Sequence, residues 1–133
     1  DTGGNAGAQT SITIIRGLAT GDVDFKNVWR IVRLELSTAI LMAVGVGVIA
    51  FGRAWLLQKD PILAIVVGIT MSCLILLAIS TGIVLPLLSK KIGLDPAVLA
   101  GPITTSIVDI CGLIIYFKVA QFFLPALRHV VAQ

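Results

Sequence analysis

Long apolar runs separated by short charged stretches dominate the pattern of the 133-residue chain. Three runs, at residues 36–57, 61–88 and 96–123, are long enough to cross about 30 Å of hydrocarbon as helices. A spanning segment must satisfy its backbone hydrogen bonds internally, so each run predicts a transmembrane helix. Pro86 is expected to kink or end the second run. Pro96 suits the first turn of the third, with Asp95 as its N-cap.

The segment at residues 3–19 is more polar and mixes glycines, Asn5, Gln9 and hydroxyl residues with isoleucines. It cannot face lipid all round, so as a helix it belongs inside a bundle or against a wet cavity. The predicted fold class is therefore all-α, a polytopic transmembrane helix bundle of about four membrane segments, the first incomplete. The start of the chain has neither a Met nor a signal-peptide pattern, and we expect a piece of a longer protein.

Composition agrees with a membrane protein: 57% of residues are hydrophobic and 13% charged, and the mean hydropathy is +1.04. The net charge of +3 is dispersed and has no basic patch with interleaved aromatics, which argues against nucleic acid as a partner. One histidine and two cysteines, without zinc-type spacing, leave little material for a zinc or haem site. We expect lipid as a partner and a multi-pass location in the plasma or inner membrane.

Residues 16–35 carry much of the charge between the first two segments. They predict either an amphipathic helix on the membrane surface or an extension of the next helix. Basic residues also predict the orientation, because cytoplasmic connections are enriched in Lys and Arg. Six basic residues fall on one predicted side and four on the other, which places the first set in the cytoplasm and the C-terminus outside. The six are Arg16, Lys26, Arg30, Arg33, Lys90 and Lys91, and the four are Arg53, Lys59, Lys118 and Arg128.

Asp109 lies near the middle of the last apolar run, where an ionised carboxylate facing lipid costs at least a few kcal/mol. Gly101, Thr105 and Gly112 share its helical stripe, a small and polar surface that leaves room for a hydrated ion or a close helix. Mg²⁺ prefers oxygen ligands and keeps several waters, so one carboxylate per chain suits it. A protonated Asp109, hydrogen-bonded inside the bundle, is the alternative.

Two further sets of residues could contribute to a cation path. Asn5, Gln9, Thr13 and Arg16 follow one stripe of the first segment, as pore lining or as interhelical packing. Glu35, at the start of the second segment, is expected to pair with Arg30 or Arg33, with a position at an ion exit as the alternative.

Two stretches resemble the membrane domain of the MgtE-type magnesium transporters and channels. Residues 3–21, GGNAGAQTSITIIRGLATG, are similar to that family's second transmembrane helix, and residues 94–117, LDPAVLAGPITTSIVDICGLIIYF, are similar to its fifth. The resemblance covers nearly the whole chain. It implies that residues 1–133 form a partial membrane domain, helices two to five, without the first helix and the cytoplasmic regulatory domains.

The resemblance also implies a homodimer in which helices two and five line a central pore for Mg²⁺, with Mn²⁺ or other divalent cations as further candidates. The cation-binding carboxylate of helix five maps onto Asp109, and Asn5 matches the pore-facing asparagine of helix two. Gly101 departs from those members that carry Asn before the helix-five proline, so that role is not carried over. The candidates for the pore and its surroundings are Asn5, Gly4, Ala8, Gln9, Gly101, Thr105 and Gly112, with Arg16 and Glu35 at interface or positioning sites.

Other functions stay open at this stage. The transport could be coupled to Na⁺ or H⁺ in an exchanger, and the chain could be a non-conducting assembly fragment. An intramembrane aspartyl protease needs two carboxylates that share a proton, whereas Asp109 stands alone within its run. We therefore expect a transporter rather than an enzyme.

Overall fold

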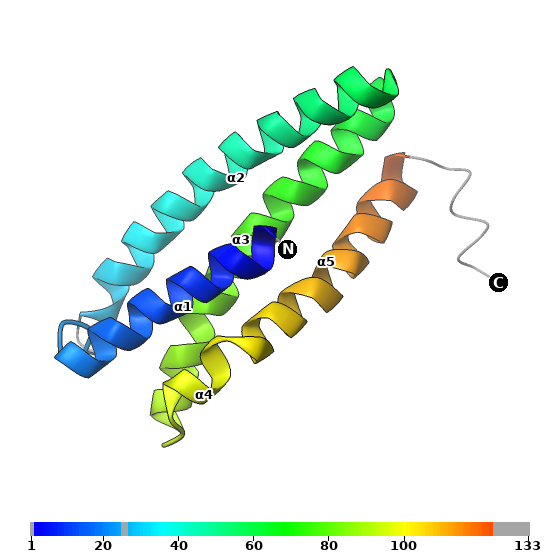
Figure 1. The fold of residues 1–133 in the computed structure, drawn as a ribbon. Helices are drawn as coiled ribbons and strands as arrows, with labels where there is room; N and C mark the ends of the chain where they lie inside the picture. Colours follow the sequence, from blue (N-terminus) through cyan, green and yellow to red (C-terminus); the bar gives the residue numbers. More distant parts are fainter. Residues whose placement is uncertain (1, 25–26, 124–133) are drawn as a thin grey trace.

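The computed structural model describes residues 2–24 and 27–123, which fold into a bundle of helices without strands (Figure 1). The elements are α1 (Thr2–Thr20), α2 (Val28–Gln58), α3 (Pro61–Lys91), α4 (Pro96–Ala100) and α5 (Pro102–Phe123). Within this described part, α2, α3 and α5 are long and apolar enough to cross a membrane. The prediction of an all-α, multi-pass membrane bundle is confirmed.

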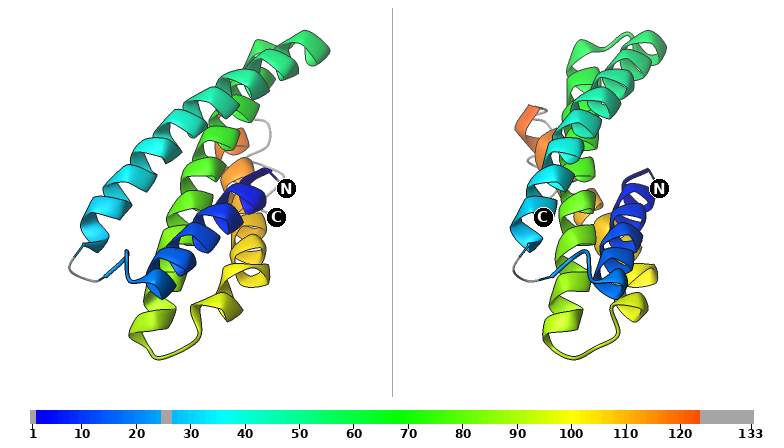
Figure 2. Two further views of the ribbon diagram at one scale, coloured as in Figure 1. Left: turned by 60° about the vertical axis from the view of Figure 1, so that its left-hand side comes forward. Right: turned by 90° about the vertical axis from the view of Figure 1, so that its left-hand side faces the viewer.

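Helix α3 is the centre of the bundle: α2 packs on one side of it, and α1 and α5 pack on the other (Figures 1 and 2). Among the described helices it has the most buried residues, many of them small. The apolar core between α2 and α3 consists of Ala39, Ala43, Ile75, Ile79 and Ile83. Small side chains let helix backbones approach closely, which is how helices associate where lipid removes the hydrophobic driving force.

An antiparallel hairpin joins α2 to α3. Lys59 ends α2 in the left-handed conformation, with φ 58°. Asp60 caps α3, its carboxylate accepting hydrogen bonds from the amides of Ile62 at 2.8 Å and Leu63 at 3.2 Å. Ser72 of α3 donates to the carbonyl oxygen of Ala43 at 2.9 Å, which fixes the register of the pair.

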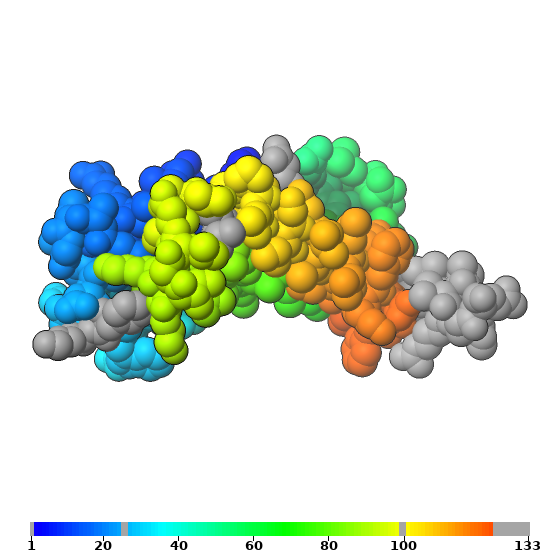
Figure 3. All heavy atoms as spheres, turned by 90° about the horizontal axis from the view of Figure 1, so that it is seen from below, coloured from blue at the N-terminus to red at the C-terminus, as the bar shows by residue number. Residues whose placement is uncertain are grey.

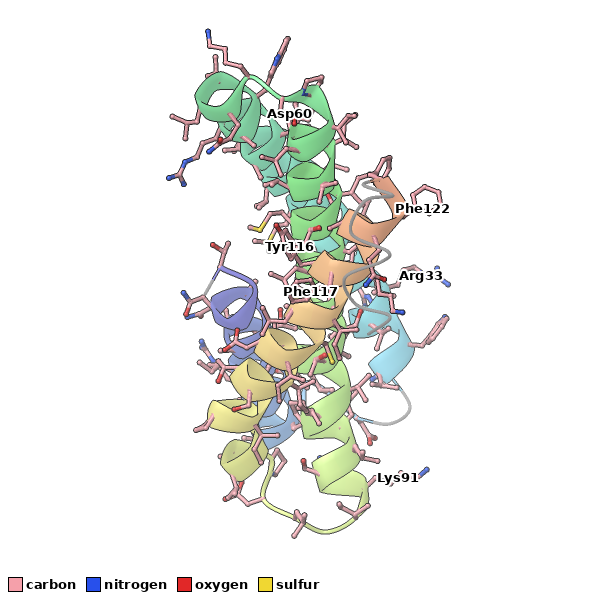
Figure 4. All side chains as sticks on the ribbon, turned by 90° about the vertical axis from the view of Figure 1, so that its right-hand side faces the viewer. Arg33, Asp60, Lys91, Tyr116, Phe117 and Phe122 are labelled. Atoms are coloured by element: carbon pink, nitrogen blue, oxygen red, sulfur yellow. The ribbon has the colours of Figure 1, made fainter. Side chains whose placement is uncertain are left out.

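Helix α1 begins beside the middle of α3 and runs toward the end at which α2 begins and α3 finishes (Figures 1 and 2). Figure 3, which views the molecule from below, shows the last residues of α1 on the left, beside the residues where α3 gives way to α4. Lys91 lies here, whereas Asp60 lies at the opposite end (Figure 4). The two connections predicted to share one side therefore do so. Lys26 and Arg128 lie outside the described residues, and the side that faces the cytoplasm stays a prediction.

The structure decides between the two predictions for one boundary and differs from the prediction at another. Helix α2 starts at Val28, so the charged stretch from that residue extends the membrane helix instead of forming a separate surface helix. The last apolar run is not one helix, because it breaks at Gly101 between α4 and α5. Pro102 causes this break, since proline has no amide hydrogen and disfavours the helical conformation of the residue before it. Asp95 caps α4 as predicted, accepting from the amide of Ala97 at 2.9 Å.

Pro86 does not end α3, which continues for five residues to Lys91. Proline within a helix leaves the carbonyl four residues earlier without its amide donor. Here that carbonyl belongs to Gly82, and the hydroxyl of Ser11 donates to it at 3.1 Å. A side chain from α1 thus satisfies the group that Pro86 frees, which lets the helix run on.

Candidate functional site

Asp109 lies in the first half of α5, with an exposed side chain. It lines an open groove of about 420 Å³ between α5 and α3, together with Leu74, Val108, Gly112 and Leu113. Leu74 lies two residues from Leu76, the middle residue of the 31-residue α3. The carboxylate is therefore placed near half the depth of the bundle.

No ion pair or hydrogen bond to Asp109 is formed among the described residues. Within the same part of the chain, no three His, Cys, Asp or Glu side chains come close enough to hold a metal ion together. One chain therefore supplies a single carboxylate at this groove. Any further ligands would have to be water, backbone or hydroxyl oxygens, or groups from another chain.

Glycines bring the start of α1 against the turn of α5 that carries Asp109. A Cβ at Gly3 would lie 2.8 Å from Leu74 Cγ and 3.2 Å from Val108 Cγ1, and a Cβ at Gly4 would lie 3.3 Å from Thr105 Cγ2. Gly112 similarly faces Leu74. In a single chain Gly4 and Gly112 therefore make packing contacts, and their place in a pore lining stays a prediction.

Hydroxyl groups connect α1, α3 and the first turn of α5, on the N-terminal side of Asp109. Besides its bond to the Gly82 carbonyl, the Ser11 hydroxyl lies 3.5 Å from that of Thr104, and both residues are fully buried. Thr105, one turn before Asp109, donates to the carbonyl of Pro102 at 3.0 Å. Thr104 and Thr105 thus serve the packing of α5 and its first turn.

The other predicted residues line two separate grooves. Asn5, Gln9 and Glu35 line a groove between α1 and α2. Ala8, Arg16 and Gly101 line one between α1 and the α4–α5 break. Within one chain, the structure does not bring Asn5 and Gln9 into the groove of Asp109.

The expected pairing of Glu35 with a neighbouring arginine is wrong. Glu35 is partly buried and turns toward α1, while Arg30 and Arg33 are exposed. No ion pair joins them in the described part of the chain. Residues two and five positions apart on a helix lie on different faces, so the charges cannot meet without distorting their side chains.

Sequence reasoning missed three residues that line these grooves: Leu74 beside Asp109, and Thr10 and Thr38 beside Glu35. Thr38 was detectable, because it lies three residues after Glu35 and so shares its helical face. Leu74 and Thr10 depend on how the helices pack, which no local pattern specifies.

Comparisons with known proteins show which family the sequence matches. A family model described as "MgtE: Divalent cation transporter" matches residues 1–119. The magnesium transporter MgtE of Thermus thermophilus is 34% identical over 125 residues, and that of Enterococcus faecalis is 33% identical over 123. The Bacillus subtilis protein of the same name is 29% identical over 124 residues.

These matches cover 94%, 92% and 93% of this chain but only 28%, 27% and 28% of the respective relatives. The chain thus spans little more than a quarter of their length. The family is described as a transporter family, which agrees with the expectation that the chain is not an enzyme. The three long apolar helices of the chain agree with a multi-pass membrane location. The chain belongs to the MgtE family of divalent cation transporters.

Proposed function

We propose that this chain forms part of a path for Mg²⁺ across the membrane and that Asp109 binds the cation near mid-depth. On this proposal residues 1–133 correspond to helices two to five of a five-helix membrane domain. Three relatives that bear the name magnesium transporter support Mg²⁺ as the ion.

The observation that carries the proposal is the exposure of a carboxylate, without a partner in the described part of the chain, at the level of Leu74. A charged side chain at the bilayer centre costs at least about 2.5 kcal/mol when nothing compensates it. Water and a divalent cation compensate it directly. Mg²⁺ retains much of its hydration shell and needs few protein ligands, which fits one carboxylate per chain.

A second copy of the chain completes the proposed site. Large apolar residues near Asp109 on α5 are exposed: Ile110 and Leu113 are each 62% exposed and Phe117 is 53% exposed. Figure 4 shows Phe117 and Phe122 on this helix. A homodimer joined through this face would bury apolar surface and bring two Asp109 carboxylates toward one ion.

The test is Mg²⁺ uptake by the intact protein in liposomes, with Asp109→Asn as the variant. The amide has nearly the same shape but no charge, so we expect flux to fall by about tenfold or more, equivalent to roughly 1.4 kcal/mol. Asp22→Asn removes a carboxylate from the exposed α1–α2 connection and should leave the flux unchanged. Full flux in Asp109→Asn, with correct assembly checked by gel filtration, would exclude Asp109 as the ligand.

The same liposomes separate a channel from a coupled exchanger. A channel responds to the Mg²⁺ gradient and the membrane potential alone. If an imposed Na⁺ or proton gradient drives uptake against the Mg²⁺ gradient, the transport is coupled, and the path is that of an exchanger.

A further inference from the structure

A second acidic side chain lies within the membrane helices, in the groove between α1 and α2. This groove, of about 330 Å³, has Ile79 of α3 in its lining. Its polar lining residues are Thr2, Asn5, Gln9, Thr10, Glu35 and Thr38. It shares no residue with the groove of Asp109.

The helix register gives the depth of Glu35. The hydrogen bond from Ser72 sets Ala43 level with Ser72 in the antiparallel pair. Glu35 lies eight residues before Ala43, so its level is that of Ser80, eight residues beyond Ser72. Ser80 lies four residues from the middle of α3, or about 6 Å at 1.5 Å per residue. A hydrocarbon layer about 30 Å thick and centred on α3 therefore includes Glu35.

The oxygen atoms in this groove are of the kind that hard divalent cations bind. Glu35 offers a carboxylate, and Asn5 and Gln9 offer carboxamide oxygens. Lys and Arg are absent from the lining, so no fixed positive charge opposes a cation there. Mg²⁺ and related ions are bound by one or two carboxylates with neutral oxygens and water completing the shell.

Thr10 supplies a further oxygen. The residue is 93% buried as a whole, but its side chain lines the groove. Its hydroxyl forms no hydrogen bond among the described residues, so it is available to an ion or a water molecule in the groove. Thr38 donates its own hydrogen to the carbonyl of Leu34 at 3.2 Å, which leaves its oxygen free to accept.

We propose that the groove between α1 and α2 is a second divalent-cation site, with Glu35 as its charged ligand and Asn5, Gln9 and Thr10 as neutral ones. The site lies closer than Asp109 to the end of the bundle that carries Lys90 and Lys91. The levels of the two carboxylates, those of Ser80 and Leu74, differ by six residues of α3, or about 9 Å along the axis. The site goes beyond the proposed function, because ion binding there does not require that Asp109 binds an ion.

Mn²⁺ serves as the probe, since it prefers the same oxygen ligands and is paramagnetic. The intact protein is reconstituted in nanodiscs with Cys73 and Cys111 replaced by serine and with a nitroxide on Leu41→Cys. Leu41 is 75% exposed and adjoins Met42, which lines the groove. Broadening of the nitroxide spectrum by Mn²⁺ therefore reports ions in this groove. Asp109→Asn is included in every sample, so that an ion at the Asp109 site cannot contribute.

We expect saturable broadening in this background and its loss in Glu35→Gln. Asn5→Leu should raise the Mn²⁺ concentration for half-maximal broadening about tenfold, while Glu35→Asp should retain binding. Thr13→Val is the matched control on α1: its hydroxyl donates to the Gln9 carbonyl, and its side chain does not line the groove. It should leave the broadening unchanged.

Unaltered broadening in Glu35→Gln, with the variant eluting as a folded protein, would overturn the proposal, as would equal losses in Glu35→Gln and Thr13→Val. These outcomes are independent of the flux test. Loss of transport in Asp109→Asn with no Mn²⁺ near Leu41 would uphold the Asp109 site and reject this one. The converse result would reject the Asp109 site alone.

Discussion

Ser11 donates a hydrogen bond to the Gly82 carbonyl, 3.1 Å away on a neighbouring helix, at the position where Pro86 deprives α3 of its own donor. The two features compensate each other. Pro86 alone would leave a buried carbonyl without a partner, which costs about 1–3 kcal/mol. Ser11 alone would compete with an amide that already occupies the carbonyl.

This relationship predicts a non-additive pair of substitutions. Ser11→Ala should destabilise the protein by about 1 kcal/mol when Pro86 is present. In a Pro86→Ala background the new amide bonds to Gly82, so Ser11→Ala should cost measurably less. Unfolding of all four proteins in mixed detergent gives the coupling free energy, which we expect to be about 0.5–1.5 kcal/mol. Strict additivity would show that Ser11 does not replace the missing amide.

The crossing of α1 and α3 depends on Gly7. A Cβ at this position would lie 2.7 Å from the carbonyl oxygen of Ala78 and 3.1 Å from Thr104 Cγ2. Because a backbone oxygen cannot move aside as a side chain can, Gly7→Ala should separate the helices and destabilise the fold by about 1–3 kcal/mol.

Gly45→Ala is the control for Gly7→Ala, since a Cβ at Gly45 meets nothing within 4 Å. It changes the same atom in a helix without a packing contact, so we expect no loss of stability. The measurement is the detergent-unfolding midpoint of both variants. A Gly7→Ala protein as stable as Gly45→Ala would contradict the close approach of α1 to α3.

The sequence pattern predicted the membrane helices well because lipid imposes length and apolarity on them, and these are local properties. The apolar run at residues 61–88 corresponds to α3, and Asp95 caps the start of α4 as expected. Pro86 shows the limit of this reasoning. Whether a proline ends a helix depended on Ser11, 75 residues away in the chain, and no window around Pro86 contains that information.

The candidate site shows the same limit. Asp109 was detectable from its charge within an apolar run, since membrane depth alone makes a carboxylate costly. The partners of Asn5 and Gln9 were not detectable. Both share a stripe with Arg16, yet they line the groove of Glu35 while Arg16 lines that of Gly101. Neighbouring helices divide one stripe between two grooves, and only the crossing geometry decides where.

Leu113 provides a test of the proposed dimer. It follows Asp109 by one turn, lines the same groove and is 62% exposed. In a protein without Cys73 and Cys111, Leu113→Cys should form a disulfide between two copies under mild oxidation if the Asp109 faces meet. Such a bond requires Cα atoms about 4.4–6.8 Å apart. Leu41→Cys on α2, 75% exposed, should stay monomeric on a non-reducing gel. Equal cross-linking of both variants would indicate random collision rather than a defined interface.

The positive charge of Arg16 leads to a prediction about how the salt concentration affects Mg²⁺ transport. Its exposed side chain lines the groove with Ala8 and Gly101, and it lies in the last two turns of α1, at the end of the bundle near Lys91. A fixed positive charge there repels a divalent cation by roughly 1 kcal/mol at a separation of about 8 Å in water. Arg16→Gln should therefore raise the initial Mg²⁺ flux up to about fivefold at low ionic strength. At 0.15 M salt the screening length is about 8 Å, so the gain in flux should shrink.

Arg16→Lys keeps the charge and should transport like the parent at both salt concentrations. If Lys and Gln change the flux alike, the shape of the arginine matters rather than its charge, and Arg16 acts by packing at the mouth of the path.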